Sequence, residues 1–430
     1  MVPHLITALT GPINELEQRV LDSMPAIERW FRLEWMEHTP PFYTSVDLRN
    51  AGFKLAPVST NLFPAGWNHL TEEMLPLAVQ AAMAAIEKIC PEARNLLIIP
   101  ENHPRNASYM ANVARLRRIF NMAGLNVRVG SVNPEIKKTT TVTLPGGESV
   151  ALEPVIRAKR RLGLKNFDPC TILLNNNLSA GAPGILEDLR EQYLLPPLHA
   201  GWSVRHKSRH FQSYEEVTKR FGKMLGIDPW LITPLFTRAG GVEPGADMQP
   251  LHEAVDTLLT KVRRKYKEYG IKSKPFAVVK AEHGTHEMDT MIVRDARELD
   301  GLAFFNGGKA AAARDSQAAV RDVIVQEGVL TQERVHEAVA EPVVYMMDRY
   351  VVGGFYRVHA GRGTDENLSA PGASFVPLAF EHSAHSLQPG ARPGASAPNR
   401  FYMYGVIARL AMLAASYELE TTDPEAEVYD

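Results

Sequence analysis

The chain is 430 residues long, with 45% hydrophobic and 22% charged residues, as in ordinary globular proteins. This length exceeds what one hydrophobic core usually organises, so two or three domains are expected. A formal net charge of −2 argues against binding to nucleic acid or to an anionic membrane surface. The sequence shows no signal-peptide pattern, no apolar run near the roughly 20 residues of a membrane span, and too few cysteines for a disulfide framework. We therefore expect a cytoplasmic protein.

The N-terminal region is predicted to contain two amphipathic helices separated by a strand and a series of turns. Apolar residues recur at helical spacing over Glu15–Trp35, and the prolines at 40 and 41 end that helix. Residues 45–58 have the composition of a strand, and residues 60–68 are rich in turn formers. A second helix is expected over Leu75–Cys90.

The following segment alternates between strands and a helix. Asn95–Pro100 and Asn126–Gly130 have the pattern of buried strands, and Tyr109–Ala123 between them has that of a helix. This βαβ order predicts a parallel sheet. A hairpin is expected over Thr139–Pro154. The apolar strand Thr171–Leu174 leads into a polar run, and ligands gather at such carboxyl ends of strands in open α/β sheets.

The Gly-rich stretch 238–247 is the best candidate for a linker. A basic helix over His252–Tyr269 follows it, and a helix over Phe401–Glu420, with an Ala- and Leu-rich face expected to be buried, closes the chain. We therefore predict an α/β protein built of α+β lobes with an N-terminal α/β substrate domain. Its three regions are a helical and substrate-loop region over 1–94, an α/β domain over 95–240 and a nucleotide-binding region over 250–430.

Four features of the C-terminal region occur in an informative order. The first is the strand Pro275–Lys280, which delivers a lysine at its end, followed by the loop 281–290 and a returning strand over Met291–Val293. A loop held between two strands, with a lysine at its mouth, can fold over nucleotide phosphates. Taken alone, a lysine that ends a strand is more often a solvated surface residue.

The second feature is the apolar strand Asp322–Val329, which ends in Gln326 and Glu327. Backbone groups past such a strand can bind an adenine edge and a carboxylate can bind ribose hydroxyls, although a strand with a polar end is the simpler interpretation. The third is a hairpin over Glu341–Arg357, with its turn predicted at Gly353 and Gly354. This hairpin leaves Arg357 on the returning strand.

The fourth feature is the loop Gly361–Asn367, which contains Arg362, Asp365 and Glu366. Oxygen ligands of this kind suit Mg²⁺, and a nearby arginine can neutralise a transferring phosphoryl group. An acidic turn is more often only solvated. The order of the four features, however, resembles that of the ATP-grasp fold, in which two α+β lobes hold ATP between them.

A more specific resemblance is carried by longer strings. The segments 42–58, 60–68, 175–181, 195–202, 226–230, 341–346 and 352–359 are similar to the proteobacterial type of glutamate–cysteine ligase. The resemblance runs from about Trp30 to the closing helix. It implies ATP-dependent activation of the γ-carboxylate of glutamate as an acyl phosphate, followed by attack of the cysteine amine. This reaction is the first step of glutathione synthesis.

The resemblance also implies roles for individual residues. Arg357 and Lys280 would be catalytic. Lys280 would hold the ATP phosphates, and Arg357 would steady the charge that develops on the phosphoryl group or the tetrahedral adduct. The residues expected to bind ATP are Lys280, Gly284, Thr285, Gln326, Glu327 and Val329. Those expected to hold Mg²⁺ are Glu366 and Asn367, with Asp348 as a third ligand.

Polar residues gathered in short turn-rich stretches suit recognition of an amino acid's ammonium and carboxylate groups, although an ordinary capped turn has the same composition. The predicted substrate-binding residues are Asp47, Arg49, Asn50, Lys54, Asn61, Asn68 and Arg205. With Lys207 and Arg209, Arg205 forms either an anion pocket or a solvated basic face. The partners are then small molecules, namely glutamate with cysteine or another amine, and the sequence leaves a homo-oligomer open.

The predicted lid loop departs from the family pattern Ala-Asp-Ala-Gly-Thr-Tyr-Gly-Met-Gly. Residues 281–289 read Ala-Glu-His-Gly-Thr-His-Glu-Met-Asp, so that of three glycines only Gly284 remains. Glu287 and Asp289 would place carboxylates near the triphosphate, and Ser59 and Asn177 stand where the family has aspartates. Two alternatives therefore stay open: a ligase for another amino acid or amine, and an amino-acid-binding pseudoenzyme.

Overall fold

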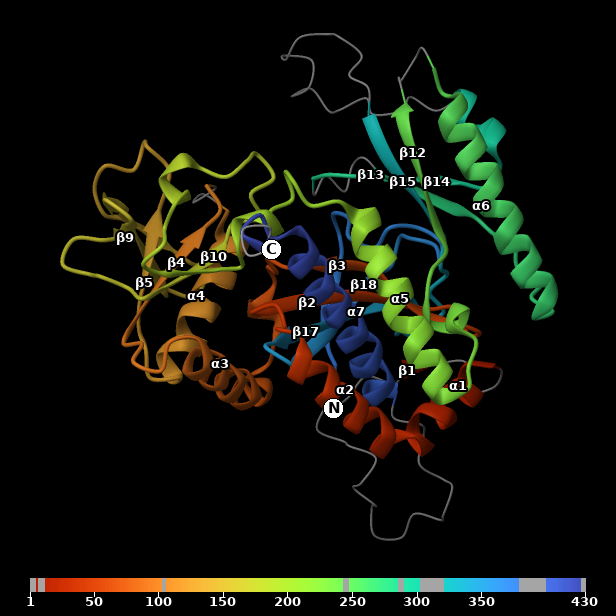
Figure 1. The fold of residues 1–430 in the computed structure, drawn as a ribbon, viewed down its shortest axis with the longest axis horizontal. Coiled ribbons are helices and arrows are strands. Elements are labelled where there is room, and N and C mark those ends of the chain that lie inside the picture. Colours follow the sequence, from red (N-terminus) through yellow and green to blue (C-terminus); the bar gives the residue numbers. More distant parts are fainter. Residues whose placement is uncertain are drawn as a thin grey trace.

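The computed structural model describes residues 5–6, 12–102, 106–242, 247–284, 290–301, 321–378 and 400–426. Residues 285–289 of the predicted lid loop, which include Thr285, Glu287 and Asp289, lie outside these ranges. Within them the chain forms three main sheets with helices packed on their faces (Figure 1), which confirms the predicted α/β class.

The central sheet joins the two ends of the chain. Its N-terminal strands are β1 (Leu5–Ile6), β2 (Tyr43–Asn50) and β3 (Leu55–Asn61), and its C-terminal strands are β16 (Arg334–Val335), β17 (Ala338–Met347), β18 (Tyr350–His359) and β19 (Ser374–Pro377). Strand β2 pairs antiparallel with β17, so that segments about 300 positions apart share hydrogen bonds. The central sheet therefore contains strands from both the predicted region 1–94 and the predicted region 250–430.

Four helices cover one face of the central sheet and share a core with it: α1 (Pro12–Asp22), α2 (Met24–Glu37), α5 (Lys207–Leu225) and α7 (Arg400–Thr422). Helix α7 is buried nearly all round, rather than on one face as predicted. The single helix predicted over Glu15–Trp35 is two helices that meet at Ser23. Pro25 explains the break, because it lacks an N–H and its ring clashes with the preceding turn of a continuous helix.

The second sheet is mainly parallel, as the βαβ pattern predicts. Its strands, in spatial order, are β11 (Tyr193–Leu195), β10 (Thr171–Asn175), β4 (Asn95–Pro100), β5 (Asn126–Ser131), β7 (Ser149–Pro154) and the antiparallel edge strand β6 (Thr140–Thr143). Helices α3 (Leu75–Ile89) and α4 (Ala107–Met122) share a core with it and with side chains of β17 and β18. A small hairpin, β8 (Ile156–Ala158) with β9 (Arg161–Gly163), follows β7.

The third sheet is antiparallel and carries helix α6 (Gln249–Glu268) on an apolar core (Figure 1). Its strands are, in order, β12 (Phe236–Val242), β15 (Arg321–Glu327), β13 (Ala277–Ala281) and β14 (Met291–Val293). The strands predicted around Lys280 and Gln326 are confirmed. The linker predicted over 238–247 is wrong in its first half, because these residues belong to β12 and pair with β15.

The hairpin β17–β18 is confirmed, but its predicted turn is wrong. The turn is formed by Asp348 and Arg349, and Asp348 has a φ of +49°, which aspartate tolerates better than most residues. Gly353 and Gly354 lie inside β18 instead. Gly354 is needed there for packing, because a Cβ atom at this position would collide with the carbonyl oxygen of Val343 on β17.

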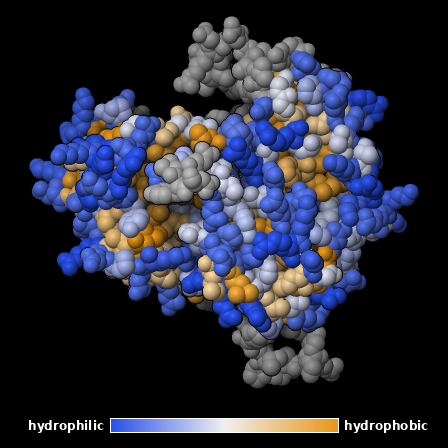
Figure 2. All heavy atoms as spheres, in the orientation of Figure 1, coloured by the Kyte–Doolittle hydropathy of each residue, from blue (hydrophilic) through white to orange (hydrophobic). Residues whose placement is uncertain are grey.

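The face of the molecule drawn in Figure 2 is largely hydrophilic, and its apolar side chains gather in small separate patches. Among the helices in the described ranges, none is long and apolar enough to cross a membrane.

Candidate active site

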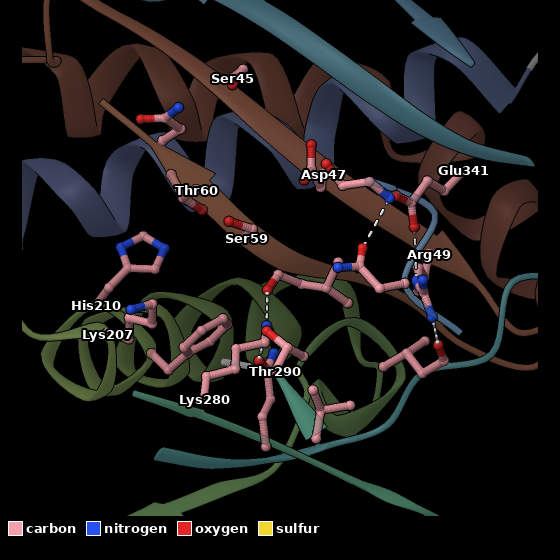
Figure 3. A pocket seen from close by; sticks show the side chains of 18 of the residues that line it. Ser45, Asp47, Arg49, Ser59, Thr60, Lys207, His210, Lys280, Thr290 and Glu341 are labelled. Carbon is pink, nitrogen blue, oxygen red and sulfur yellow. Dashed lines mark hydrogen bonds and ion pairs between the residues drawn. The ribbon is translucent and has the colours of Figure 1, made fainter. Parts of the chain in front are cut away.

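A cavity of about 400 Å³ lies between the central sheet and the four-stranded sheet (Figure 3). Side chains from β2, β3, β17 and β18 line one side, and side chains from β13, β14 and β15 line the other. The first turn of α5, the loop 365–369 and further residues that include Trp202, Arg205 and Gly284 also line it. The cavity thus brings together residues from both ends and the middle of the chain.

On the central-sheet side, two arginines alternate with two carboxylates. Arg49 Nε donates to Glu341 Oε2 at 2.8 Å, while Arg357 Nη1 donates to Glu341 Oε1 at 2.7 Å and to Asp47 Oδ2 at 3.2 Å. Strand register produces this arrangement, because Glu341 lies opposite Arg357 across the β17–β18 pair. Burial raises the pKa of Glu341, but Arg49 and Arg357 outweigh burial and hold that pKa below its usual value. The Glu341 carboxylate therefore stays ionised.

Across the cavity, Lys280 and Gln326 present polar groups from neighbouring strands. Lys280 Nζ donates to the carbonyl of Val58 and to Gln326 Oε1, both at 2.9 Å. Burial lowers the pKa of Lys280 to about 8, and the nearby Arg49 acts in the same direction. Gln326 Nε2 is buried and has no hydrogen-bond partner within the described part of the chain. A lysine and an unused amide donor therefore face the same space.

Lys54 and Glu327 are engaged with each other. Lys54 Nζ lies 2.8 Å from Glu327 Oε2, and both side chains are 1% exposed. The Glu327 carboxylate also accepts hydrogen bonds from Trp230 Nε1 at 3.2 Å and from the Leu235 N–H at 2.8 Å. Glu327 thus reaches the cavity wall with its carboxylate already bound, and Lys54 is not among the lining residues. Their predicted contacts with ribose and substrate do not fit this placement.

Of the remaining predicted substrate-binding residues, some line the cavity and others do not. Asn61 lines the cavity, as Asp47 and Arg49 do. Asn50 lies outside it, where its Nδ2 donates to Glu333 Oε1 at 2.6 Å. Asn68 lies in the short 3₁₀ turn Trp67–His69 and is not among the described lining residues.

Of the predicted basic group, Arg205 and Lys207 line the cavity, whereas Arg209 is exposed. Arg205 is buried and binds Glu418 through two hydrogen bonds, of 2.7 and 2.9 Å. Lys207 Nζ donates to the carbonyls of Ala281 and Gly284, at 2.7 and 2.8 Å. It therefore ties the start of the loop after β13 to helix α5.

The predicted Mg²⁺ ligands are not brought together. Asp365 and Asn367 line the cavity, whereas the Glu366 carboxylate accepts hydrogen bonds from Gly363 N–H at 2.6 Å and from Arg362 at 3.1 Å. Asp348 is at the hairpin tip, seven residues from Glu341, or about 23 Å along a strand. No cluster of three or more His, Cys, Asp or Glu that could hold a metal occurs among the described residues.

The sequence analysis did not identify His210 and Thr60. Both are buried and line the cavity, and both have a side-chain atom without a hydrogen-bond partner in the described structure, His210 Nε2 and Thr60 Oγ1. No local pattern marks them, because a histidine on the buried face of an amphipathic helix is usually a core residue.

A model of the family described as glutamate-cysteine ligase matches residues 17–419. The chain is 54% identical to a Methylobacillus flagellatus KT protein provisionally named gamma-glutamylcysteine synthetase, with a TM-score of 0.87 and coverage of 98% of this chain and 100% of that one. A D-alanyl-alanine synthetase A from Vibrio cholerae is also similar, at 12% identity and a TM-score of 0.33, over 74% of this chain and 81% of its own. No curated protein matches the chain.

Proposed function

Because the chain belongs to the glutamate–cysteine ligase family, we propose that it uses ATP to join the γ-carboxylate of glutamate to the amine of cysteine, through a γ-glutamyl phosphate. One observation carries the proposal. Lys280 and Gln326 face Asp47 and Arg357 across a single cavity that also contains the oxygen-bearing loop 365–369. A nucleotide and an amino acid can therefore lie side by side between the two sheets.

The nucleotide is assigned to the side of the four-stranded sheet. Lys280 would hold the phosphates, and its ammonium is available because its present partners are neutral oxygens of Val58 and Gln326. The backbone near Val329 and the unused Gln326 amide would contact the base. Gly284, with a φ of +80°, starts the loop that would cover the phosphates, and Thr285 would continue it.

Glutamate is assigned to the side of the central sheet. Asp47 would bind its ammonium group, and Arg357 would steady the charge that develops on the γ-carboxylate and the phosphoryl group. Among the described lining residues, the five cations Arg49, Arg205, Lys207, Lys280 and Arg357 exceed the four carboxylates of Asp47, Glu327, Glu341 and Asp365 by one. This excess of positive charge suits anionic reactants.

Mg²⁺ would neutralise the triphosphate and the transferring phosphoryl group. Asp365 and Asn367 fit this ion, since both line the cavity from alternate positions of one loop, whereas Glu366 does not line it. The Asp365 carboxylate pairs with Arg294 and Asn367 Oδ1 accepts from Ser369 N–H, so both oxygens would exchange these partners for the ion. One or two carboxylates with phosphate oxygens and water are a usual ligand set for Mg²⁺.

The test measures ADP release with glutamate while candidate amines are supplied one at a time. Cysteine should give the highest kcat/KM, and Lys280→Ala should lower kcat at least about a hundredfold, the usual cost of removing one charge-stabilising donor. Lys274→Ala is the matched control, because Lys274 is exposed just before β13. Faster turnover with another amine would identify a different acceptor. No ADP release with any amine would indicate a binding protein, as the carboxylates of Glu287 and Asp289 could cause.

A further inference from the structure

His210 is a buried imidazole on the cavity wall that the roles above do not use. It lies in the first turn of α5, and its residue is 2% exposed. Figure 3 shows its ring extending from α5 toward strand β3, where Thr60 lies. Its two ring nitrogens have different surroundings.

One ring nitrogen is oriented by a carboxylate. His210 Nδ1 lies 3.1 Å from Glu418 Oε2, and Glu418 is itself bound by Arg205. Burial raises the pKa of Glu418, but Arg205 and His210 together outweigh burial and bring it to about 2, so the carboxylate stays ionised. A carboxylate can only accept, so Nδ1 carries the proton and the lone pair is on Nε2.

The other ring nitrogen, Nε2, is unsatisfied within the part of the chain that the structure describes. Nε2 of His210 is buried without a hydrogen bond to any described residue, and so is the nearby Thr60 Oγ1 on the same cavity wall. Buried polar atoms are nearly always satisfied, because leaving one unpaired is unfavourable. Because both residues line one cavity, a polar group of a ligand bound there would complete them.

We propose that His210 is the catalytic base that takes a proton from the ammonium group of the acceptor amino acid, with Thr60 as a second contact to that group. The inference rests on the proposed ligase function. It has a clear chemical reason, because the amine of a free amino acid is protonated at neutral pH and an ammonium has no lone pair for attack.

The proposed step moves two protons and exchanges a C–O bond for a C–N bond. One ammonium proton moves to His210 Nε2, and the imidazolium is stabilised by Glu418. The freed amine nitrogen then bonds to the γ-carbonyl carbon, and the bond from that carbon to the phosphate oxygen breaks, with its electrons leaving on phosphate. The second excess proton on nitrogen leaves with the phosphate. Burial lowers the pKa of His210, although Glu418 opposes this, so the imidazole is neutral and able to accept at pH 7.

The test compares two acceptors in the full-length enzyme with saturating ATP and glutamate. Hydroxylamine is unprotonated at neutral pH and needs no base, whereas cysteine does. In His210→Asn, the Asn amide can still donate to Glu418 but the base is lost. We expect kcat with cysteine to fall by about a hundredfold to ten-thousandfold. Formation of γ-glutamyl hydroxamate should stay within about threefold of wild type.

His38→Asn is the matched control, because His38 Nδ1 also binds a glutamate of α7, Glu420, at 2.8 Å but lies outside the cavity lining. It should leave both rates unchanged, and His210→Gln should behave as His210→Asn does. If His210→Asn lost the same factor of activity with both acceptors, or lost none with cysteine, the inference about His210 would be overturned but the ligase function would not. A wild-type chain that forms neither product would overturn the ligase function and the inference with it.

Discussion

At the scale of single residues, Asp365 and Glu366 are neighbours with different predicted roles. Asp365 lines the cavity and pairs with Arg294, whereas Glu366 does not line it and its carboxylate is held by Arg362 and Gly363. We expect Asp365→Asn to raise the Mg²⁺ concentration for half-maximal turnover by about tenfold or more, the equivalent of one lost charged ligand. Glu366→Gln makes the same carboxylate-to-amide change at the neighbouring position. It is the control and should change this Mg²⁺ concentration little.

The measurement is ADP release against Mg²⁺, supported by Mn²⁺ binding in the presence of a non-hydrolysable ATP analogue. A larger shift in Glu366→Gln than in Asp365→Asn would restore Glu366 as the ligand. It would mean that this carboxylate rotates into the cavity when nucleotide binds.

At the scale of elements, the hairpin β17–β18 depends on a glycine away from its turn. A Cβ at Gly354 would overlap the backbone oxygen of Val343, which cannot rotate aside. Gly354→Ala should therefore lower the free energy of unfolding by about 1–3 kcal/mol, as overpacking does. Gly184→Ala is the control, because nothing lies within 4 Å of a Cβ there, and it should stay within about 0.5 kcal/mol.

Urea denaturation of both variants measures the difference. Equal stabilities would show that β17 and β18 can separate enough to admit a methyl group. In that case the close approach of the strands that carry Glu341 and Arg357 would not be a constraint on the site.

At the scale of the whole molecule, the Lys54–Glu327 pair connects the β2–β3 turn of the central sheet to the end of β15 in the four-stranded sheet. Lys54→Met leaves the Glu327 charge buried without its cation, which should cost about 3–5 kcal/mol of unfolding free energy. Adding Glu327→Gln removes that charge and should recover part of the loss. A single variant as stable as wild type would show that water reaches Glu327.

The same pair predicts a dependence on pH. Burial lowers the pKa of Lys54 from its usual 10.5 to about 8, although Glu327 opposes this. Between about pH 8 and 10 the unfolded chain then binds more protons than the folded one, so stability rises with pH from this group. The advantage of wild type over Lys54→Met should therefore grow across this window, by at most about 1.4 kcal/mol per pH unit. An advantage independent of pH would contradict the lowered pKa.

Most elements and the family were predictable from the sequence alone. The apolar runs around Lys280 and Gln326 identify strands by local spacing, and the strand Asn95–Pro100 has the predicted bounds. The family resemblance rests on continuous segments of the sequence, which can be identified without knowing which residues are in contact. Local pattern was sufficient here because helix and strand periodicity reflects which side of a short segment is buried.

Only the tertiary structure shows that both ends of the chain form the central sheet and how the residues of the site are arranged. The pairing of β2 with β17 joins distant segments, and no local spacing encodes such a contact. Only packing shows that Lys54 is neutralised by Glu327, and only the path of one loop shows that Asp365 rather than Glu366 faces the cavity. His210 is a core-like helix residue in the sequence. It becomes a candidate base because Glu418, 208 residues away, orients its ring, while Nε2 has no hydrogen-bond partner among the described residues.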